Sequence, residues 1–332
     1  MQTNEFMIDL AKCLAEAGKA ESTSASYIRN LYQLNGKKPF KNLTFLKKTD
    51  EIVERINTYA VSTQKTLYAT ICSVLSTKCS DVKSFKKVYD YYYGKMMEMS
   101  KDAREVASKN EKTEKQKENW IEWSEVEKIH NDLQEEIAKF GKILTPANYE
   151  KLLQYVILSL YTDIAPRRNQ DYLQMYIVKK YSDAMPNDKN YLDMSSHRFI
   201  FNVYKTARKS GQQTKDIPEN LWSSIMKYLE YHPLYKGLAK RKNEPVKFLV
   251  FHDGSPMTVV NAITRILNKV FGKKIGSSML RHLYLSSKYG ALLEEQKKDA
   301  MDMGHSVSQA RDYIKSDKSE TGSVASAKSL KT

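Results

Sequence analysis

Apolar residues recur every three or four positions through the first third of the chain, which is the spacing of an amphipathic helix. Four such segments precede residue 76, and a longer one follows them. The apolar stripe of this longer segment fades into alternating charges, as in a solvated helix or a linker. The pattern predicts a bundle of helices over residues 6–17, 26–34, 51–60, 65–75 and 85–118.

After residue 118 the pattern predicts further helices and one pair of strands. The strands cover 198–205 and 212–218, which are rich in β-branched and aromatic residues, and Ser210-Gly211 forms the turn between them. We therefore expect a short β-hairpin inside a helical domain. The helices are expected at 149–165, 219–230, 256–271, 276–288 and 291–303, with a last one starting at Ser306.

Capping residues mark three of the expected helix starts. A Ser or Thr followed three residues later by Glu or Gln forms a capping box, and Thr followed by Pro places proline at the first helical position. The pairs are Ser124 with Glu127, Thr145 with Pro146, and Ser306 with Gln309.

The expected fold is mainly α with a small β-hairpin or sheet, arranged in two domains. A helical domain covers 1–106, a charged linker 107–119, and a second domain 120–316. Residues 317–332 are rich in Ser, Lys and Ala, and we expect this tail to be disordered.

The charge of the chain limits its partners. The sequence holds 54 Lys and Arg against 39 Asp and Glu, a net charge of +15. Up to residue 118 there are 21 basic and 15 acidic residues, and beyond it 33 and 24, so both domains are basic. This balance favours a polyanionic partner, and nucleic acid held by both domains fits it well, although two ordinary lysine-rich surfaces would give the same counts.

Other classes of protein and site are excluded by what the sequence lacks. No apolar run is long enough to span a bilayer, and the acidic first residues do not form a secretory signal, so we expect a soluble, intracellular protein. No phosphate-binding glycine loop of the P-loop or dinucleotide type occurs, and we expect neither a nucleotide cofactor nor a metal. The three cysteines, Cys13, Cys72 and Cys79, have no paired spacing, and we expect buried thiols and no disulfide.

Four short stretches after residue 160 hold basic or nucleophilic residues in a fixed order. They read APRRNQDY, FNVYKTARKSGQQTKDIP, SSMLRHLYLSSKYG and MGHSVSQARDY. In that order they resemble the catalytic domain of the tyrosine recombinases, the integrase family of phages and mobile elements. The resemblance covers about residues 120–316. The helical first domain is similar in position and type to the family's core-binding domain, so the family's two-lobed architecture is expected.

The first two stretches supply an arginine and a lysine. Arg168, followed three positions later by Asp171, matches the family's first arginine, and Arg167 is the alternative. Lys205, just before Thr206, matches the lysine that the family carries on a hairpin strand. We expect Asp171 to support the arginines and not to touch DNA.

The last two stretches supply the second arginine and the nucleophile. The family's box HxxRH is represented by Arg281 and His282, with Ser278 in place of the first histidine. His305 matches the family's Gly-His-Ser, and Tyr313 matches the nucleophilic tyrosine. We expect His282 to be a buried histidine with a backbone partner, and Ser278 to be at most a hydrogen-bond donor to phosphate.

The resemblance implies cleavage of DNA through a 3′-phosphotyrosyl intermediate without metal or ATP. Arg168 and Arg281 would hold the scissile phosphate, because a guanidinium binds two oxygens at once. Lys205 would protonate the leaving 5′-oxygen, and His305 would donate a hydrogen bond to the same phosphate. The family implies double-stranded DNA as partner, a tetramer on paired sites, and a source in a virus or mobile element.

Two other functions fit the same residues. A type IB topoisomerase uses a similar set of side chains, and a DNA-binding protein whose catalytic residues have decayed would explain Ser278. In the first domain, candidate DNA contacts cluster around one loop, where solvated lysines would look the same. They are Lys37, Lys38, Lys41, Lys47 and Lys48.

Overall fold

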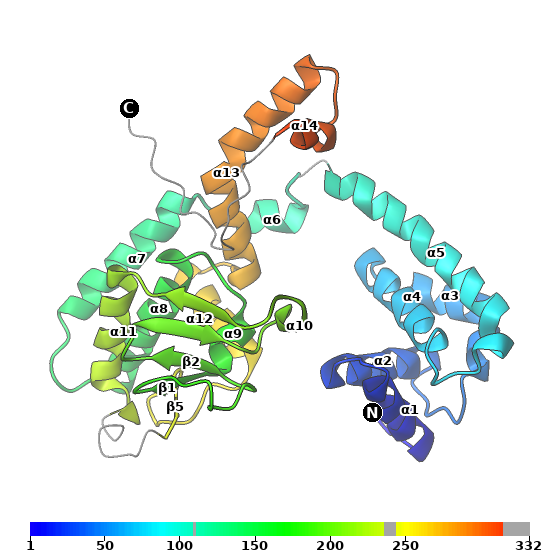
Figure 1. Cartoon of the computed structure of the whole chain (residues 1–332), viewed down its shortest axis with the longest axis horizontal. Coiled ribbons are helices and arrows are strands. Elements are labelled where there is room, and N and C mark those ends of the chain that lie inside the picture. The colour runs from blue at the N-terminus through cyan, green and yellow to red at the C-terminus, as the bar shows by residue number, and fades with distance from the viewer. Residues whose placement is uncertain (109–110, 236–243, 315–332) are drawn as a thin grey trace. The chain divides into compact units, whose positions relative to one another are not determined.

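The computed structural model describes residues 1–108, 111–235 and 244–314 (Figure 1). The chain divides into two compact units, Met1–Lys112 and Thr113–Thr332, and the division falls within the expected linker. The tail expected to be disordered, 317–332, lies outside the described residues. No helix within the described ranges is long and apolar enough to cross a membrane.

The first unit is a helical bundle built on the expected apolar stripes. Its core includes Leu14, Leu31, Ile56 and Ile71, and the hydroxyl of buried Tyr92 donates to the Leu46 carbonyl at 2.9 Å. The elements are α1 (Glu5–Glu16), α2 (Glu21–Leu34), the 3₁₀ turn η1 (Thr44–Lys47), α3 (Thr49–Asn57), α4 (Val61–Leu75) and α5 (Val82–Ser108).

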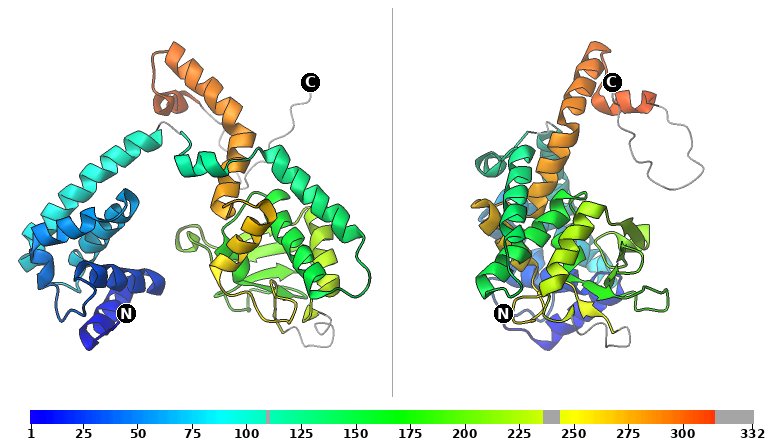
Figure 2. Two further views of the ribbon diagram at one scale, coloured as in Figure 1. Left: turned by 180° about the vertical axis from the view of Figure 1, so that it is seen from behind. Right: turned by 90° about the vertical axis from the view of Figure 1, so that its left-hand side faces the viewer.

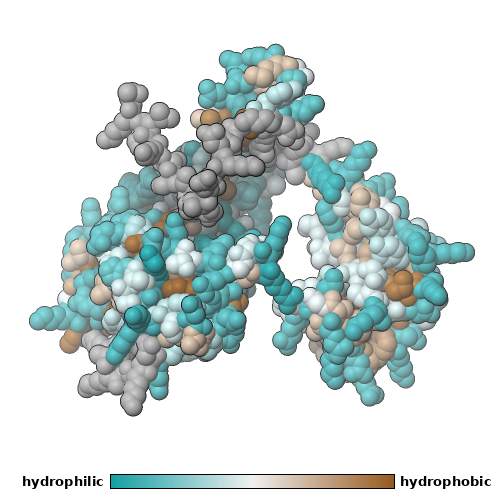
Figure 3. Space-filling model, viewed as in Figure 1, coloured by the Kyte–Doolittle hydropathy of each residue, from teal (hydrophilic) through white to brown (hydrophobic). Residues whose placement is uncertain are grey.

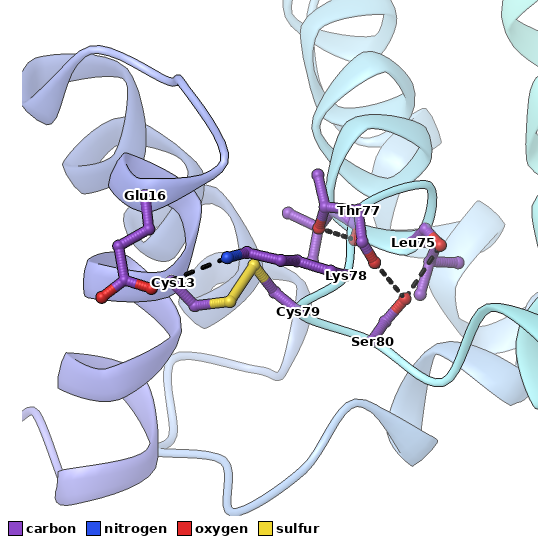
Figure 4. Close-up of a disulfide and its surroundings, with 8 residues drawn as sticks. Cys13, Glu16, Leu75, Thr77, Lys78, Cys79 and Ser80 are labelled. Atoms are coloured by element: carbon purple, nitrogen blue, oxygen red, sulfur yellow. Dashed lines mark hydrogen bonds and ion pairs between the residues drawn. A yellow bond between two sulfur atoms is a disulfide. The ribbon is translucent and has the colours of Figure 1, made fainter.

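A disulfide in this unit corrects the expectation of three free thiols. Cys13 on α1 is bonded to Cys79 in the loop after α4, with their Cα atoms 5.8 Å apart (Figure 4). The fold brings together two residues that are 66 positions apart, which no local spacing reveals. Cys72 is free and buried as expected, and burial raises its pKa to about 11.

The second unit combines helices with a mixed sheet that is larger than the expected hairpin. Its helices are α6 (Glu114–Asn119), α7 (Trp123–Ala138), α8 (Pro146–Thr162), α9 (Asn169–Leu173), α10 (Ala207–Ser210), α11 (Glu219–Tyr231), α12 (Val260–Phe271), α13 (Ser277–Asp302) and α14 (Val307–Tyr313). Its strands are β1 (Met175–Val178), β2 (Asn190–Asp193), β3 (Arg198–Phe201), β4 (Gln213–Asp216) and β5 (Val246–Lys247). The chain is thus mainly α with a small sheet.

The sheet has the order β4-β3-β2-β1-β5, with β1 and β2 parallel and the other pairs antiparallel. The expected hairpin is present as β3 and β4. Strands β1, β2 and β5 were not predicted, because short buried runs such as Met175–Val178 carry no alternation that separates strand from helix.

One face of the sheet packs on the main core of this unit. Phe199 and Phe201 of β3 point into that core, which includes α8, whereas Ile200 lies in a small cluster on the other face. Seen from behind, α7, α8 and α12 lie on one side of the sheet (Figure 2). This arrangement holds α9 and the β3–β4 hairpin at fixed positions beside each other.

Two of the three capping predictions are confirmed. Thr145 caps α8 with Pro146 at its first position, and Ser306 and Gln309 bond each other's backbone at the start of α14. The Ser124 prediction is wrong, because α7 already begins at Trp123.

The expected break between helices 276–288 and 291–303 is also wrong. A single helix, α13, runs from Ser277 to Asp302, because Gly290 is tolerated within it. We call the part of this unit from Leu285 to Ile314 the C-terminal arm; it extends away from the sheet (Figures 1 and 2).

Candidate active site

Three arginines surround one buried carboxyl group at the start of α9. Asp171 is 3% exposed, and burial raises its pKa, while the charges of Arg167, Arg168 and Arg281 act to lower it. Arg281 comes from the first turns of α13, so the fold joins two motifs that are far apart in sequence. We call these four residues the arginine cluster.

Arg167 is the arginine that Asp171 binds directly. Its Nε donates to Asp171 Oδ2 at 2.9 Å, and its Nη1 donates to Gln213 Oε1 on β4 at 3.1 Å. The guanidinium also lies over the Phe201 ring, 3.7 Å from its centre. These contacts use the Nε donor, one Nη1 donor and one face of the Arg167 guanidinium, so Arg167 is a poorer candidate for binding a phosphate than Arg168 or Arg281.

Arg168 and Arg281 keep their donors available. Both side chains are half-buried, and the only hydrogen bond found for either within the described ranges is a 3.4 Å contact from Arg281 Nε to the Ser277 carbonyl. The other oxygen of the carboxyl group, Asp171 Oδ1, is buried without a hydrogen-bond partner among the described residues. Two guanidinium groups whose charges act on the same buried carboxyl group, and whose donors are open, suit an anion.

The backbone beside Arg168 is anchored by Asn169. Its side chain accepts a hydrogen bond from Tyr161 Oη at 2.7 Å and donates to Thr264 Oγ1 at 3.0 Å. Burial raises the pKa of Tyr161, whereas the charge of Arg281 acts to lower it. Tyr161 therefore lies near the arginine cluster. Arg168 therefore projects from a start of α9 that is tied to α8 and α12.

Lys205 lies outside the strand on which it was expected. Strand β3 ends at Phe201, and Lys205 sits exposed in the turn before α10. The strand is shorter than predicted because Asn190 Oδ1 accepts from the backbone N–H groups of Asn202 and Val203, which ends the pairing with β2. Lys205 follows Tyr204, whose ring lies 5.4 Å from the Arg167 guanidinium.

The first and last residues of the HxxRH box, Ser278 and His282, are exposed. His282 is on the solvent side of α13, so the expectation that it is buried and bonded to backbone is wrong. One helical turn separates positions 278 and 282, and Ser278 is exposed on the same side. Arg281, one position away, is turned toward the interior.

His305 and Tyr313 form a second, separate pair. Gly304 adopts a left-handed conformation, φ 72°, and starts the turn that leads from α13 into α14. The rings of His305 and Tyr313 are stacked with their centres 5.4 Å apart, and Tyr313 is 69% exposed.

The structure does not bring this pair to the arginine cluster. Ile314, the residue after Tyr313, lines a pocket whose α13 residues begin at Tyr289. At 1.5 Å per residue, Tyr289 lies about 12 Å beyond Arg281 along the helix. The continuous α13 thus holds the tyrosine away from the arginines of its own chain.

The five candidate lysines of the first unit are all exposed. Lys37, Lys38 and Lys41 lie in the loop between α2 and η1. Lys48 pairs with Glu51 at 3.0 Å, and Lys47 bonds Ser84 Oγ at 3.0 Å and lies over the Phe85 ring. Because Ser84 and Phe85 are on α5, this surface continues into exposed Lys83 and Lys87, which sequence reasoning missed.

Sequence reasoning also missed the residues that hold Arg167. Gln213 and Phe201 are on the two strands of the hairpin, and only the register of β3 on β4, which pairs them, could have indicated this. Within residues 1–108, 111–235 and 244–314, no three His, Cys, Asp or Glu side chains are grouped so that they could hold a metal ion.

No protein-family model matches the sequence, and comparison with curated proteins finds no match.

Proposed function

We propose that this protein is a tyrosine recombinase that cleaves and rejoins double-stranded DNA at specific sites. The observation that carries the proposal is the arginine cluster: two arginines from distant motifs, Arg168 and Arg281, lie beside one buried carboxyl group with open donors. In the proposed reaction these two guanidinium groups bind the non-bridging oxygens of the scissile phosphate and stabilise the charge that grows there.

The other candidate residues take the roles that the chemistry requires. Tyr313 Oη bonds to phosphorus, the bond from phosphorus to the 5′-oxygen breaks, and Lys205 gives that oxygen a proton. The 3′-phosphotyrosyl link keeps the energy of the broken ester, so a second DNA end can reverse the step without ATP. His305, stacked on Tyr313, donates a hydrogen bond to the phosphate.

The distance between Tyr313 and the cluster has to be closed for this reaction. Because α13 is one unbroken helix, we propose that Tyr313 is supplied by a second copy of the chain bound to the paired DNA site. This agrees with the tetramer expected from the family resemblance. A second copy would also cover exposed apolar side chains of the C-terminal arm, part of whose surface is brown in Figure 3. Leu292, Met301 and Met303 are among these exposed side chains.

The test is a set of nicked suicide DNA substrates, from which the leaving strand diffuses away. Wild-type protein is expected to accumulate covalent DNA adducts that survive denaturation, and Tyr313→Phe is expected to form none. Wild-type protein that binds the DNA but forms no adduct on a pool of candidate sites would exclude the enzyme.

The exposed arm also supports a second candidate, a DNA-binding protein that no longer cleaves. Tyr313 is separated from the arginines, and Ser278 replaces a histidine of the family box. The same assay separates the two candidates. A DNA-binding protein that no longer cleaves would bind DNA with the usual salt dependence of phosphate contacts but would never become covalently linked to it.

A further inference from the structure

Arg167 joins α9 to both strands of the β3–β4 hairpin. It donates to Asp171 on α9 at 2.9 Å and to Gln213 on β4 at 3.1 Å, and it stacks on Phe201 of β3 at 3.7 Å. Asp171 and Arg167 are both largely buried, with 4% and 21% of their side chains exposed. One guanidinium therefore fixes the hairpin relative to the helix that begins next to Arg168.

The connection between the two strands carries Lys205 and is braced at its base. Tyr204 Oη donates to the Gly211 carbonyl at 2.6 Å, and Gln212 Nε2 donates to Asn202 Oδ1 at 2.7 Å. Tyr204 itself lies beside the Arg167 guanidinium. Lys205 is thus an exposed side chain on a turn whose base is held against Arg167.

We propose that Arg167 is a positioning residue that sets the place of Lys205 relative to the phosphate held by Arg168 and Arg281. This rests on the proposed function. A general acid must come within hydrogen-bond distance of the leaving oxygen, and a displacement of about 1 Å costs on the order of 100-fold in rate. A lysine on a loose turn would meet that requirement rarely, whereas a turn fixed to α9 moves together with the phosphate site.

Gln213→Ala is the variant that separates positioning from folding. It removes the contact between Arg167 and β4, and leaves the ion pair with Asp171 intact. Arg167→Ala would instead leave a buried carboxylate without its partner, which destabilises a protein strongly. Arg167→Lys keeps the charge but loses the fork that joins two partners. Thr214→Ala is the matched control, since Thr214 is exposed and points to the opposite face of β4.

The decisive readout uses two suicide substrates that differ in one atom. In the second substrate a sulfur replaces the bridging 5′-oxygen, so the leaving group departs as a thiolate and needs no proton, because a thiol is far more acidic than an alcohol. A variant that lacks only a correctly placed acid is therefore slow on the oxygen substrate and restored on the sulfur substrate.

Gln213→Ala and Arg167→Lys are expected to lose about 10- to 100-fold in the rate of adduct formation on the oxygen substrate. On the sulfur substrate they are expected to come within about threefold of wild type, as Lys205→Ala should, whereas Arg281→Ala should stay slow on both. Thr214→Ala should match wild type on both. DNA affinity and melting temperature of Gln213→Ala should not change measurably.

Two results would overturn this role for Arg167. The first is wild-type cleavage of the oxygen substrate by Gln213→Ala and Arg167→Lys; the second is a defect that the sulfur substrate does not restore. Wild-type protein that forms no adduct on either substrate would instead remove the proposed function, and the role of Arg167 with it.

Discussion

The arginine cluster and the C-terminal arm belong to the same unit but are built in opposite ways. The cluster lies on elements that pack against the main core, and Asp171, Asn169 and Arg167 are tied to at least three of them. The arm carries His305 in the turn after α13 and exposed Tyr313 at the end of α14, with apolar side chains in solvent. In the proposed function, the half of the site that binds phosphate is therefore preorganised, whereas the half that carries the nucleophile is completed by a second copy of the chain.

The largest loss in the rate of adduct formation should come from removing an arginine of the arginine cluster. Arg281→Ala removes one of the two open guanidinium groups, and loss of such a charge stabiliser costs about 10²- to 10³-fold in rate. Adduct formation should fall by that factor, while DNA affinity changes only a few-fold. Arg198→Ala, which removes an exposed arginine paired with Asp216, should behave as wild type in a gel assay for adducts.

A mixing experiment tests whether the nucleophile half comes from another copy. Tyr313→Phe and Arg281→Ala should each form almost no adduct alone. Mixed in equal amounts, they should reach about a quarter of the wild-type yield, since half of random pairings are mixed and one site of each such pair is complete. If the two variants are well folded but their mixture forms no adduct, Tyr313 acts at the phosphate bound by the arginines of its own chain.

The stability of the second unit should depend on pH through one buried histidine, His232. Buried His232 donates from Nε2 to the Lys247 and Phe248 carbonyls, and its Nδ1 accepts from the N–H groups of Leu234 and Tyr235. A second ring proton would break the Nδ1 contacts, and burial lowers the pKa of His232 to about 4.

Because this pKa is lower in the folded state than in the unfolded state, stability is complete above about pH 6.5 and is lost as the pH falls toward 4. The loss attributable to His232 should be about 3 kcal/mol, measured by denaturant unfolding between pH 7.5 and pH 4. The slope should flatten in His232→Gln. Equal slopes in wild type and His232→Gln would exclude this histidine as the cause.

The smallest effect, a change in DNA affinity, should come from removing a lysine that contacts only the DNA backbone. Lys41→Ala should lower affinity a few-fold and reduce the slope of log affinity against log salt by about 1, without changing the rate of cleavage once DNA is bound. Lys48→Ala should have less effect, because Lys48 is paired with Glu51 in the free protein. If Lys41→Ala cleaved more slowly than wild type at saturating DNA, Lys41 would contribute to cleavage and not to DNA binding alone.

The helices were predictable from the sequence because each carries its own period of apolar residues, as α1, α4 and α11 do. The arginines and Asp171 were predictable as a set from motif order. Features that depend on tertiary contacts could not be predicted. They are the disulfide between Cys13 and Cys79, the hydrogen bond from Arg167 to Gln213, and the buried strands β1 and β2. The continuity of α13 was missed because a glycine in a helix is unfavourable but tolerated, and that choice decides where Tyr313 lies.

The central claim, that Tyr313 becomes linked to DNA, is tested most directly by identifying the residue that carries the nucleotide. Wild-type protein would be trapped on the suicide substrate, digested with trypsin and nuclease, and analysed by mass spectrometry. We expect peptide 312–315, which contains Tyr313, to carry a 3′-linked nucleotide, and we expect Tyr313→Phe to yield no linked peptide. A nucleotide on any other residue, or DNA-bound protein with no linked peptide, would contradict it.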